Sequence, residues 1–291
     1  MKPAYNRFVI LSVACSILLG ASESLAQAYQ ITETPEQINI VTPELEASIR
    51  KKGYVTGIYR QTFLDKKTGF RDAGSGLDIA DWIMEPGSDM SYRDHLDPGL
   101  IYQFDNPVHG MRAKRCIEGP QICTKAKQLS PKVIRGRDFV AIEQKFTYLT
   151  AAPGRKTGST WTQLIVLPKG KRYFISMDRI DSVNSSDAMF LRIDMPGHIH
   201  HHKDDTFSEI YLSYHGRIPA TEFYETFAPD EKFNYRRDKN KTPARFIRAY
   251  RLRDPKTGKQ GPWLAGMTLD PSVVHEAWCH ERPRRKGGYI C

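Results

Sequence analysis

Alternating apolar and polar positions run through the middle of the chain and predict β-strands. The segment 140–148 places apolar residues on one face and charged or polar residues on the other, which is the period of a strand with one wet side. The segments 161–167 and 172–180 continue as strands, and Pro168-Lys169-Gly170 supplies a turn between them. Together these segments predict an antiparallel meander.

Strand signals continue on both sides of this meander, and helical signals are few. We expect a first hairpin between Gly53 and Asp81, a surface loop over 85–99, and further strands over four segments: 188–194, 209–214, 245–252 and 262–268. One helical turn is predicted at Pro43–Glu46, and short helices over 219–227 and after Asp270-Pro271. The pattern predicts an all-β protein, in which residues 27–291 form a single antiparallel β-sandwich of supersandwich type with one or two short helices.

The first residues have the features of a secretory signal peptide. Lys2 and Arg7 precede the apolar run 8–19, and Ser24-Leu25-Ala26 offers small residues where a signal peptidase cleaves. We therefore expect residues 1–26 to be removed and the mature protein to be periplasmic or secreted. The apolar run is too short to predict a stable membrane span.

The charge of the chain favours an acidic partner. Of the 43 basic and 33 acidic residues, Lys2, Arg7 and Glu23 lie in the predicted leader, which leaves 41 basic and 32 acidic residues and a net charge of +9. A basic exported protein suits an acidic saccharide, such as a polymer that contains uronic acids. The basic residues are scattered and match no RNA- or DNA-binding motif, so we expect no nucleic-acid partner.

Four cysteines follow the predicted leader. Cys116 and Cys123 flank the turn-forming residues Glu118-Gly119-Pro120, which predicts a Cys116–Cys123 disulfide and leaves Cys279 and Cys291 as a second pair. An exported protein is more often held by disulfides than by a zinc site, and the cysteine spacing fits no zinc knuckle. The alternative is four free, partly buried thiols.

The stretch 194–217 is the densest part of the chain in proton-transfer and metal-binding groups. In an extended conformation, three imidazoles share one face: His198, His200 and His202. Farther along, Glu209 and Tyr211 alternate with apolar positions, which predicts a half-buried strand.

Two kinds of chemistry, and one plain alternative, fit this stretch. His200, His202 and Glu209, followed by Gly216, resemble the first motif of the cupins with a longer spacing before the glutamate, which implies one divalent metal ion. The second hypothesis needs no cofactor: His198 or His200 acts as general acid or base, with Glu209 as its partner and Tyr211 nearby. The plain alternative is a solvated, His-rich loop before a strand.

Two further groups of residues could contact a ligand. Arg236 and Arg237 lie in the basic segment 233–241, and a guanidinium binds a carboxylate through two parallel hydrogen bonds. Glu276 and His280 would lie one turn apart on the predicted C-terminal helix and could form an acid–base pair. For both groups the alternative is an ordinary solvated surface.

The runs RDFVAIEQKFTY and STWTQLIVLPKGKRYFISMDRIDSVNSSD, which cover the central strands, resemble those of galactose-mutarotase-like β-supersandwich proteins. The resemblance extends as a pattern from about Gly53 to Trp278. It implies a concave sheet that binds carbohydrate, with Trp161 and His109 among the substrate-binding residues. It also implies chemistry of the sugar-epimerase or polysaccharide-lyase type, in which His or Tyr is the base and Arg neutralises a uronate carboxylate.

These expectations amount to an exported protein that binds an acidic saccharide and acts on it by His, Glu and Tyr chemistry. The alternatives are a cupin-like, metal-dependent enzyme and a non-catalytic glycan-binding protein of the cell envelope. The metal content of the purified protein would distinguish the cupin-like enzyme from the leading hypothesis. Binding of a glycan without turnover would identify the non-catalytic protein.

Overall fold

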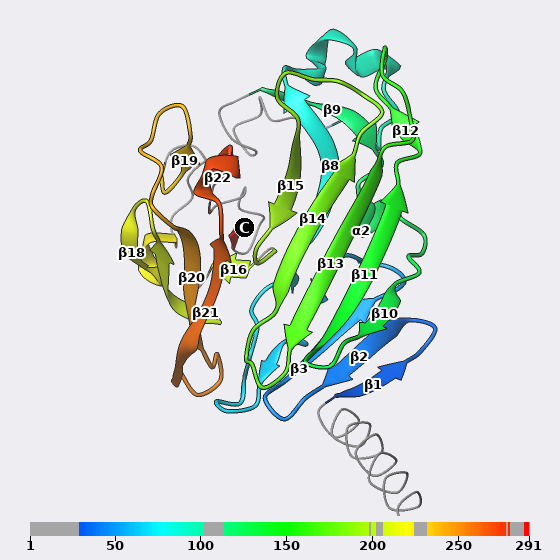
Figure 1. The fold of residues 1–291 in the computed structure, drawn as a ribbon. Coiled ribbons are helices and arrows are strands. Elements are labelled where there is room, and N and C mark those ends of the chain that lie inside the picture. Colours follow the sequence, from blue (N-terminus) through cyan, green and yellow to red (C-terminus); the bar gives the residue numbers. More distant parts are fainter. Residues whose placement is uncertain are drawn as a thin grey trace, which may run out of the picture.

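The computed structural model describes residues 29–101, 113–197, 199–201, 206–223, 232–277, 279 and 288–290. Strands dominate these ranges, and the paired strands are antiparallel. The prediction of an all-β protein is therefore confirmed. Figure 1 shows a large sandwich, which contains the central meander, and a second group of strands beside it near the C-terminal end of the chain.

Four sheets carry most of the strands. The first sheet has the order β1 (Gln30–Glu33), β2 (Gln37–Val41), β3 (Leu45–Arg50), β5 (Leu64–Asp65) and β6 (Phe70–Arg71). The meander sheet has the order β10 (Lys132–Arg135), β11 (Phe139–Thr147), β13 (Thr160–Pro168) and β14 (Ile175–Asp181). The third sheet has the order β12 (Thr150–Ala151), β9 (Lys114–Gly119), β8 (Ile79–Pro86) and β15 (Phe190–Asp194). The C-terminal sheet has the order β18 (Gly216–Pro219), β17 (Phe207–Leu212), β20 (Phe246–Arg253) and β21 (Gln260–Thr268).

The meander sheet packs one face against the first and third sheets. Ile38 and Ile40 of β2 belong to the same buried cluster as Val140 of β11 and Ile165 of β13. A second cluster joins residues of β8 and β9 to Trp161 at the other end of β13. Because alternate side chains of β13 point inward, its residues alternate between buried and half-buried positions along all nine residues.

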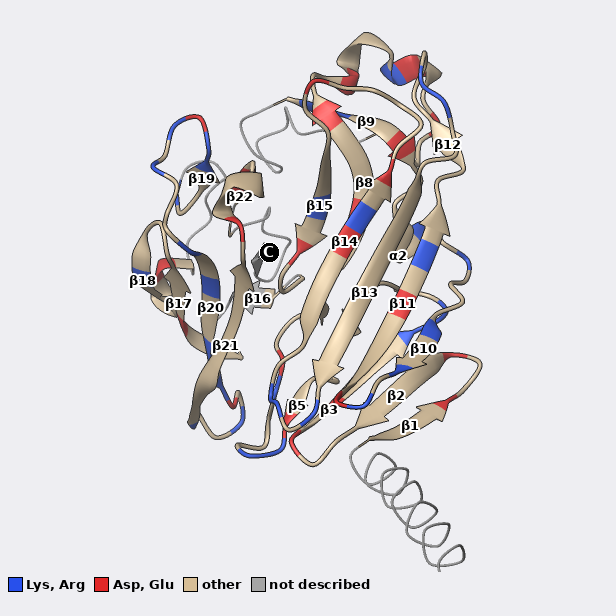
Figure 2. Cartoon of the chain, in the orientation of Figure 1, with Lys and Arg blue, Asp and Glu red and all other residues tan. Residues whose placement is uncertain are grey.

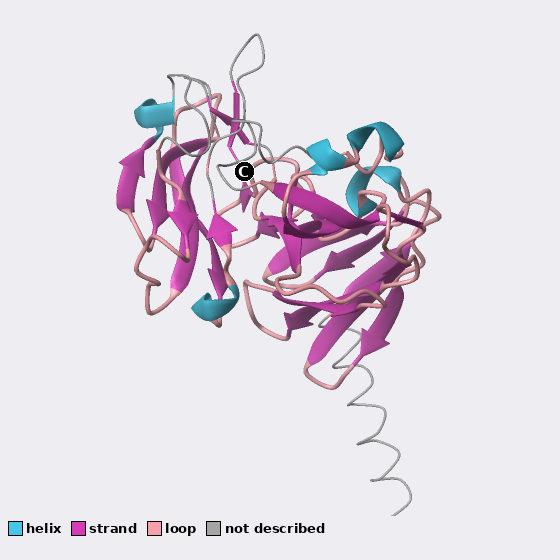
Figure 3. Ribbon diagram, turned by 90° about the horizontal axis from the view of Figure 1, so that it is seen from above, coloured by secondary structure: helices cyan, strands magenta, loops and turns pink. Residues whose placement is uncertain are grey.

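The C-terminal sheet buries its own apolar face. Ile210, Leu212, Tyr250 and Leu252 of β17 and β20 belong to one buried cluster, together with Ile199. This face is turned toward the sandwich, since a Cβ added to Gly266 of β21 would meet the Met195 side chain at 3.0 Å. Seen from above, in Figure 3, the C-terminal sheet stands beside the sandwich as a separate group of strands.

Three short strand pairs complete the fold: β4 (Ile58–Tyr59) with β7 (Gly76–Leu77), β16 (Ile199–His201) with β23 (Gly288–Ile290), and β19 (Tyr235–Arg236) with β22 (Glu276–Ala277). The described helical segments are α2 (Ile122–Lys125) and four 3-10 turns at Asp89–Ser91, Arg93–His95, Ala220–Phe223 and Pro271–Val273. None of the helices in these ranges has the length and apolar character of a membrane span.

The helix predictions fared less well than the strand predictions. Asp270 does cap a helical start, because its carboxylate accepts a hydrogen bond from the Ser272 amide at 2.9 Å. The helix ends after one 3-10 turn, however, and the chain returns to the extended conformation in β22. The helical turn predicted at Pro43–Glu46 is also wrong, because Leu45 begins strand β3.

Candidate functional site

The outer face of the C-terminal sheet collects aromatic and charged side chains. Residues that oppose each other in an antiparallel ladder lie on the same face of the sheet. Glu209 of β17 opposes Arg251 of β20, and Arg251 opposes Trp263 of β21. On the other side of β17, Tyr211 opposes Arg217 of β18. These five residues therefore share the face that does not pack on the sandwich, and we call them the Trp263 face.

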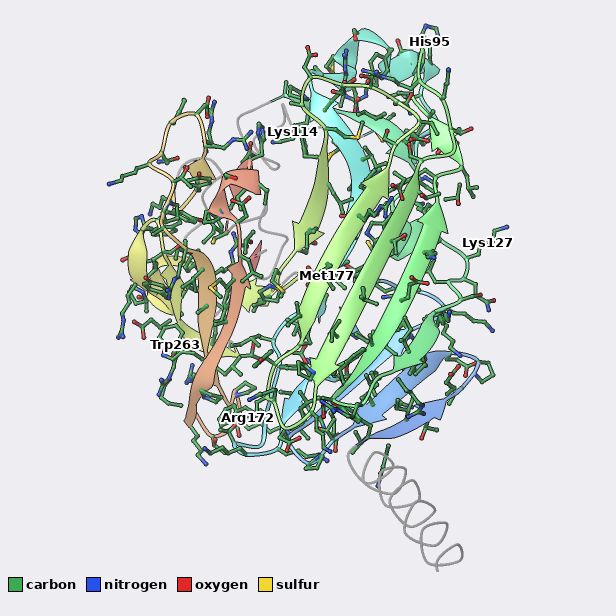
Figure 4. All side chains as sticks on the ribbon, viewed as in Figure 1. His95, Lys114, Lys127, Arg172, Met177 and Trp263 are labelled. Atoms are coloured by element: carbon green, nitrogen blue, oxygen red, sulfur yellow. The ribbon has the colours of Figure 1, made fainter. Side chains whose placement is uncertain are left out.

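Two guanidinium groups approach the indole ring of Trp263. The Arg251 Cζ lies 5.9 Å from the ring centroid, and the Arg217 Cζ lies 5.8 Å from it. Arg251 belongs to the neighbouring strand, whereas Arg217 reaches across β17 and β20 from the sheet edge. Both distances lie within the range of a cation–π interaction. Figure 4 labels Trp263 on the C-terminal sheet, apart from Met177 on the meander.

The two guanidiniums differ in their acidic partners. The Arg217 Nη1 lies 3.6 Å from the Glu209 Oε1, and the two side chains are 72% and 27% exposed. Arg251 forms no ion pair with any described residue. Its guanidinium contacts the Trp263 ring instead. The face thus holds two cations and one anion around an aromatic ring. Such a surface can stack on an apolar ligand face and accept an anionic group.

Positive charge is concentrated in this part of the molecule. Within 206–223 and 232–277 there are 12 Lys and Arg residues and 6 Asp and Glu residues, whereas 29–101 and 113–197 contain 23 and 19. Figure 2 shows Lys and Arg on β20 and on the loop that follows β19. The ranges 206–223 and 232–277 therefore carry an excess of +6 against +4 in the longer ranges, in strands and loops together, which favours an anionic ligand in this part of the molecule.

Of the predicted site residues, the structure brings Glu209 and Tyr211 together on the Trp263 face. The strand predicted for them is confirmed as β17. The extended conformation predicted for the His-rich stretch is present at β16, which pairs with β23. His198, His202, His109 and His280 lie outside the described residues, and of His200 the structure describes the backbone alone. The metal-site hypothesis for His200, His202 and Glu209 thus stays a prediction; within the described ranges no cluster of three metal-ligand residues occurs.

Trp161 lies in the core, where its ring has no exposed face for a sugar. It is fully buried, and its Nε1 donates a hydrogen bond to the Asp178 Oδ1 at 2.8 Å. Burial, and the nearby charge of Asp78, raise the pKa of Asp178 to about 7. The amide nitrogen of Gln163 lies 3.2 Å from the Asp78 Oδ2 and 3.3 Å from the Asp178 Oδ1, so it bridges the two carboxyl groups.

Glu276 is held in an ion pair within the fold. Its two carboxylate oxygens each lie 2.9 Å from the Lys114 Nζ, and the two side chains are 7% and 4% exposed. This contact joins β22 to β9, and the adjacent ring of His275 stacks on Phe190 at 5.1 Å. Glu276 lies in strand β22 and not in the predicted helix; His280 lies outside the described residues, so its pairing with Glu276 stays a prediction.

The basic segment after Phe233 folds back on itself. Arg236 pairs with Asp238 at 3.1 Å. The Arg237 guanidinium donates a hydrogen bond to the Ser272 carbonyl oxygen at 2.5 Å. These contacts place Arg236 and Arg237 next to β22, away from the residues of the Trp263 face.

The predicted Cys116–Cys123 disulfide is wrong. Both cysteines are free and buried, and the sulfurs have different partners. The Cys116 thiol donates to the Glu118 carbonyl at 3.3 Å, and Cys123 lies 2.9 Å from the Asp81 Oδ1. Burial raises the pKa of both thiols, with a further contribution from Asp89 at Cys116 and from Asp81 at Cys123. Cys279 is also a free, buried thiol, and Cys291 lies outside the described residues.

Sequence reasoning missed three residues of the Trp263 face: Arg217, Arg251 and Trp263. The strands predicted over 245–252 and 262–268, which carry Arg251 and Trp263, are confirmed as β20 and β21. The available signal was the parity of the strands, because Arg251 and Trp263 alternate with the buried Tyr250 and Leu252 and with Leu264. What parity cannot supply is the register that sets Arg251 opposite both Glu209 and Trp263.

No protein-family model matches the chain, and no curated protein matches it in sequence.

Proposed function

We propose that the protein is an exported protein that binds an acidic saccharide, of the uronate type, on the Trp263 face. The observation that carries the proposal is the Trp263 ring with guanidiniums of Arg217 and Arg251 on it, of which Arg251 has no ion pair among the described residues. A sugar ring would stack on the indole, and the carboxylate of a uronate would accept hydrogen bonds from a guanidinium.

Three sequence features support the same proposal. The predicted leader of residues 1–26 would bring the protein to a compartment where acidic polysaccharides occur. The resemblance of the central strands to galactose-mutarotase-like proteins points to carbohydrate as the ligand class. The net charge of +10 for the whole chain agrees with an acidic ligand.

Acid–base catalysis on the bound saccharide is the enzymatic form of this proposal. Tyr211 opposes Arg217 and lies on the same face as Glu209, so a hydroxyl and a carboxylate lie beside the guanidiniums. In an elimination, one of these groups removes the proton on the carbon next to a carboxylate that a guanidinium neutralises, a C=C bond forms as the C–O bond to the next sugar breaks, and the other group protonates the departing oxygen. Incubation with polygalacturonate would then produce an unsaturated sugar, which absorbs in the ultraviolet, and Tyr211→Phe would stop its formation while binding persists.

The binding test compares polygalacturonate with its methyl ester, which lacks the charge. We expect the wild-type protein to bind the acid form at low salt and the ester at least tenfold more weakly. Arg251→Ala should weaken binding of the acid form about tenfold, since a hydrogen bond to a charged group contributes about 1.5–3 kcal/mol. Trp263→Ala should also weaken it, because the ring on which the sugar stacks is lost. Arg179→Ala is the matched control, because Arg179 is exposed on β14 and pairs with Asp181. Equal binding of the acid and the ester would overturn the proposal.

A further inference from the structure

A second aromatic ring with two guanidiniums lies on the other side of the fold, at the end of β4. The Arg50 Cζ lies 4.7 Å from the centroid of the Tyr59 ring, and the Arg60 Cζ lies 6.0 Å from it. Arg50 ends strand β3, and Arg60 follows Tyr59 directly. The Tyr59 ring and the Arg50 side chain are half-buried, and Arg60 is exposed. The ring is therefore reachable, and one of its cations faces solvent.

Neither guanidinium has a carboxylate partner in the part of the chain that the structure describes. The Arg50 Nη1 donates to the Gln37 Oε1 at 3.4 Å, and its Nε donates to the Lys52 carbonyl at 3.3 Å. Both acceptors are neutral. Arg60 forms no ion pair with a described residue. Two positive charges close to one ring repel each other, and an anion between them would remove that repulsion.

The outer face of the first sheet holds Arg50 through a chain of neutral polar groups. The Gln37 amide nitrogen donates to the Asn39 Oδ1 at 2.6 Å, and the Ser48 hydroxyl donates to the same oxygen at 2.8 Å. Gln37 opposes Arg50 in the ladder, and Asn39 opposes Ser48. These groups position the guanidinium without neutralising it, so its charge stays available to a ligand.

The segment on both sides of β4, the strand that ends at Tyr59, has an unusual backbone that is fixed at several points. Thr56 and Gln61 have φ values of 73° and 56°, a region that costs energy for residues with a Cβ. The Thr56 hydroxyl accepts a hydrogen bond from the Ala80 amide at 3.0 Å. The Gln61 amide donates to the Asp72 carboxylate at 2.8 Å, and Gly57 donates to the Gln163 Oε1 at 2.9 Å. The fold thus retains a strained backbone conformation, which presents Tyr59 and Arg60 beside Arg50.

We infer that Arg50, Tyr59 and Arg60 form a second binding site, which takes the oxyanion of an acidic saccharide between the two guanidiniums and the sugar ring against Tyr59. A carboxylate can accept two parallel hydrogen bonds from one guanidinium. An aromatic ring beside a cation suits a ligand that has both an apolar face and a charge. This site shares no residue with the Trp263 face, so it stands whether or not that face binds saccharide.

The test counts binding sites on the full chain by calorimetric titration with a short oligogalacturonate. We expect two sites on the wild-type protein, one site on Arg60→Ala and one site on Trp263→Ala. We call the site of Arg50, Tyr59 and Arg60 the Tyr59 site. The affinity of the site that remains in each variant shows which residues form it, and Arg60→Ala should weaken the Tyr59 site at least tenfold. Lys67→Ala, which removes an exposed cation from the turn between β5 and β6 at the other end of β3 from Arg50, should keep both sites.

The outcomes separate the two proposals. Two sites that persist in both Arg60→Ala and a Tyr59→Ala variant, with unchanged affinities, would overturn the Tyr59 site alone. A single site that is lost in Arg60→Ala and kept in Trp263→Ala would overturn the Trp263 face and support the Tyr59 site. Inorganic sulfate and the methyl-esterified oligosaccharide complete the test. Sulfate binding at Tyr59 as tight as that of the oligosaccharide would overturn the saccharide class, and equal binding of the ester would overturn the anionic group.

Discussion

The Trp263 face and the Tyr59 site have the same parts and are built in different ways. Each has an aromatic ring with two guanidiniums within about 6 Å of its centroid. On the Trp263 face, the residues come from four neighbouring strands whose ladder fixes their positions. At Tyr59, Arg50 and Tyr59 end the short strands β3 and β4, and Arg60 lies between Tyr59 and Gln61, which has a φ of 56°.

The two sites also differ in how their cations are balanced. Glu209 neutralises Arg217 on the C-terminal sheet, whereas the amide of Gln37 and a backbone carbonyl hold Arg50. If both proposals hold, an anionic ligand would meet the Glu209 carboxylate beside Arg217 at the first site and uncompensated charge at the second. The first site would then be regulated by an internal charge, and the second would be open to an anion.

The largest expected effect is a loss of stability when the ion pair between the sandwich and the C-terminal part of the chain is broken. Glu276→Ala removes the carboxylate that pairs with the buried Lys114 ammonium between β22 and β9. We expect the free energy of unfolding to fall by about 3–5 kcal/mol, because breaking a buried pair from one side leaves a charge that water no longer solvates. Chemical denaturation measures the loss.

The paired replacement Lys114→Met with Glu276→Met is the control for this change. It removes both charges and keeps apolar volume, so it should recover most of the stability of the wild-type protein. A loss below about 1 kcal/mol in the single variant would contradict a structural role for the ion pair.

The second prediction separates the sites by pH. Burial raises the pKa of Asp178 to about 7, so the folded protein retains a proton that the unfolded chain releases near pH 4. This contribution to stability is complete below about pH 4 and is lost as the pH rises through about 7. Asp178 contacts Gln163, which also holds the Gly57 amide next to β4. Ionisation strengthens the hydrogen bond that Gln163 donates to Asp178, so a change of binding with pH is expected at Tyr59, through Gln163 and Gly57, and not at the Trp263 face.

Asp178→Asn tests this coupling because it removes the titration and keeps the shape. Between pH 5 and pH 8 the wild-type protein should lose on the order of 2 kcal/mol of stability, and the variant should lose clearly less. Melting temperatures and Trp161 fluorescence follow the change, since the Trp161 indole donates its hydrogen bond to Asp178. Identical pH profiles of the two proteins would refute it.

Sequence patterns predicted the strands of the C-terminal sheet and the meander better than the segment around Tyr59. Strand alternation located β11, β13, β17, β20 and β21, because an inward face of a sheet must be apolar along its length. The same parity could have excluded Trp161 as a sugar platform, since it is in phase with the buried Ile165 and Leu167. A large aromatic residue on a strand is more informative when its face is identified first.

Other features depend on contacts that no local pattern contains. Strands β2 and β3 are an exception, because buried Ile38 and Ile40 alternate with outer polar residues such as Asn39, and the sequence analysis missed this short local period. The segment around Tyr59 depends on Asp72 and Ala80, which fix its backbone from a distance along the chain. Cys116 and Cys123 have a spacing typical of a disulfide loop, yet strand pairing and the Asp81 contact hold their sulfurs apart.

The third prediction sharpens the contrast between a sheet and a strained loop. Gln61 is exposed and has a φ of 56°, so Gln61→Gly should stabilise the protein by up to about 1 kcal/mol by removing the steric cost of its Cβ. Gln61→Ala keeps that cost and serves as the control, with a stability close to that of the wild type. A destabilised glycine variant would show that the Gln61 side chain contributes more than its backbone strain costs.

The smallest effect concerns the carboxylate that distinguishes the two sites. Glu209→Gln removes the partner of Arg217, so an acidic oligosaccharide no longer competes with an internal anion at the Trp263 face. A single charge about 7 Å away in water is equivalent to about 0.6 kcal/mol, so we expect roughly threefold tighter binding at low salt and almost no change at high salt. The Tyr59 site should be unaffected. Glu143→Gln, which breaks an exposed pair with Lys145 on the meander sheet, is the matched control. Weaker binding in Glu209→Gln would instead mean that the carboxylate positions Arg217 for the ligand, and the two sites would then differ in construction but not in charge regulation.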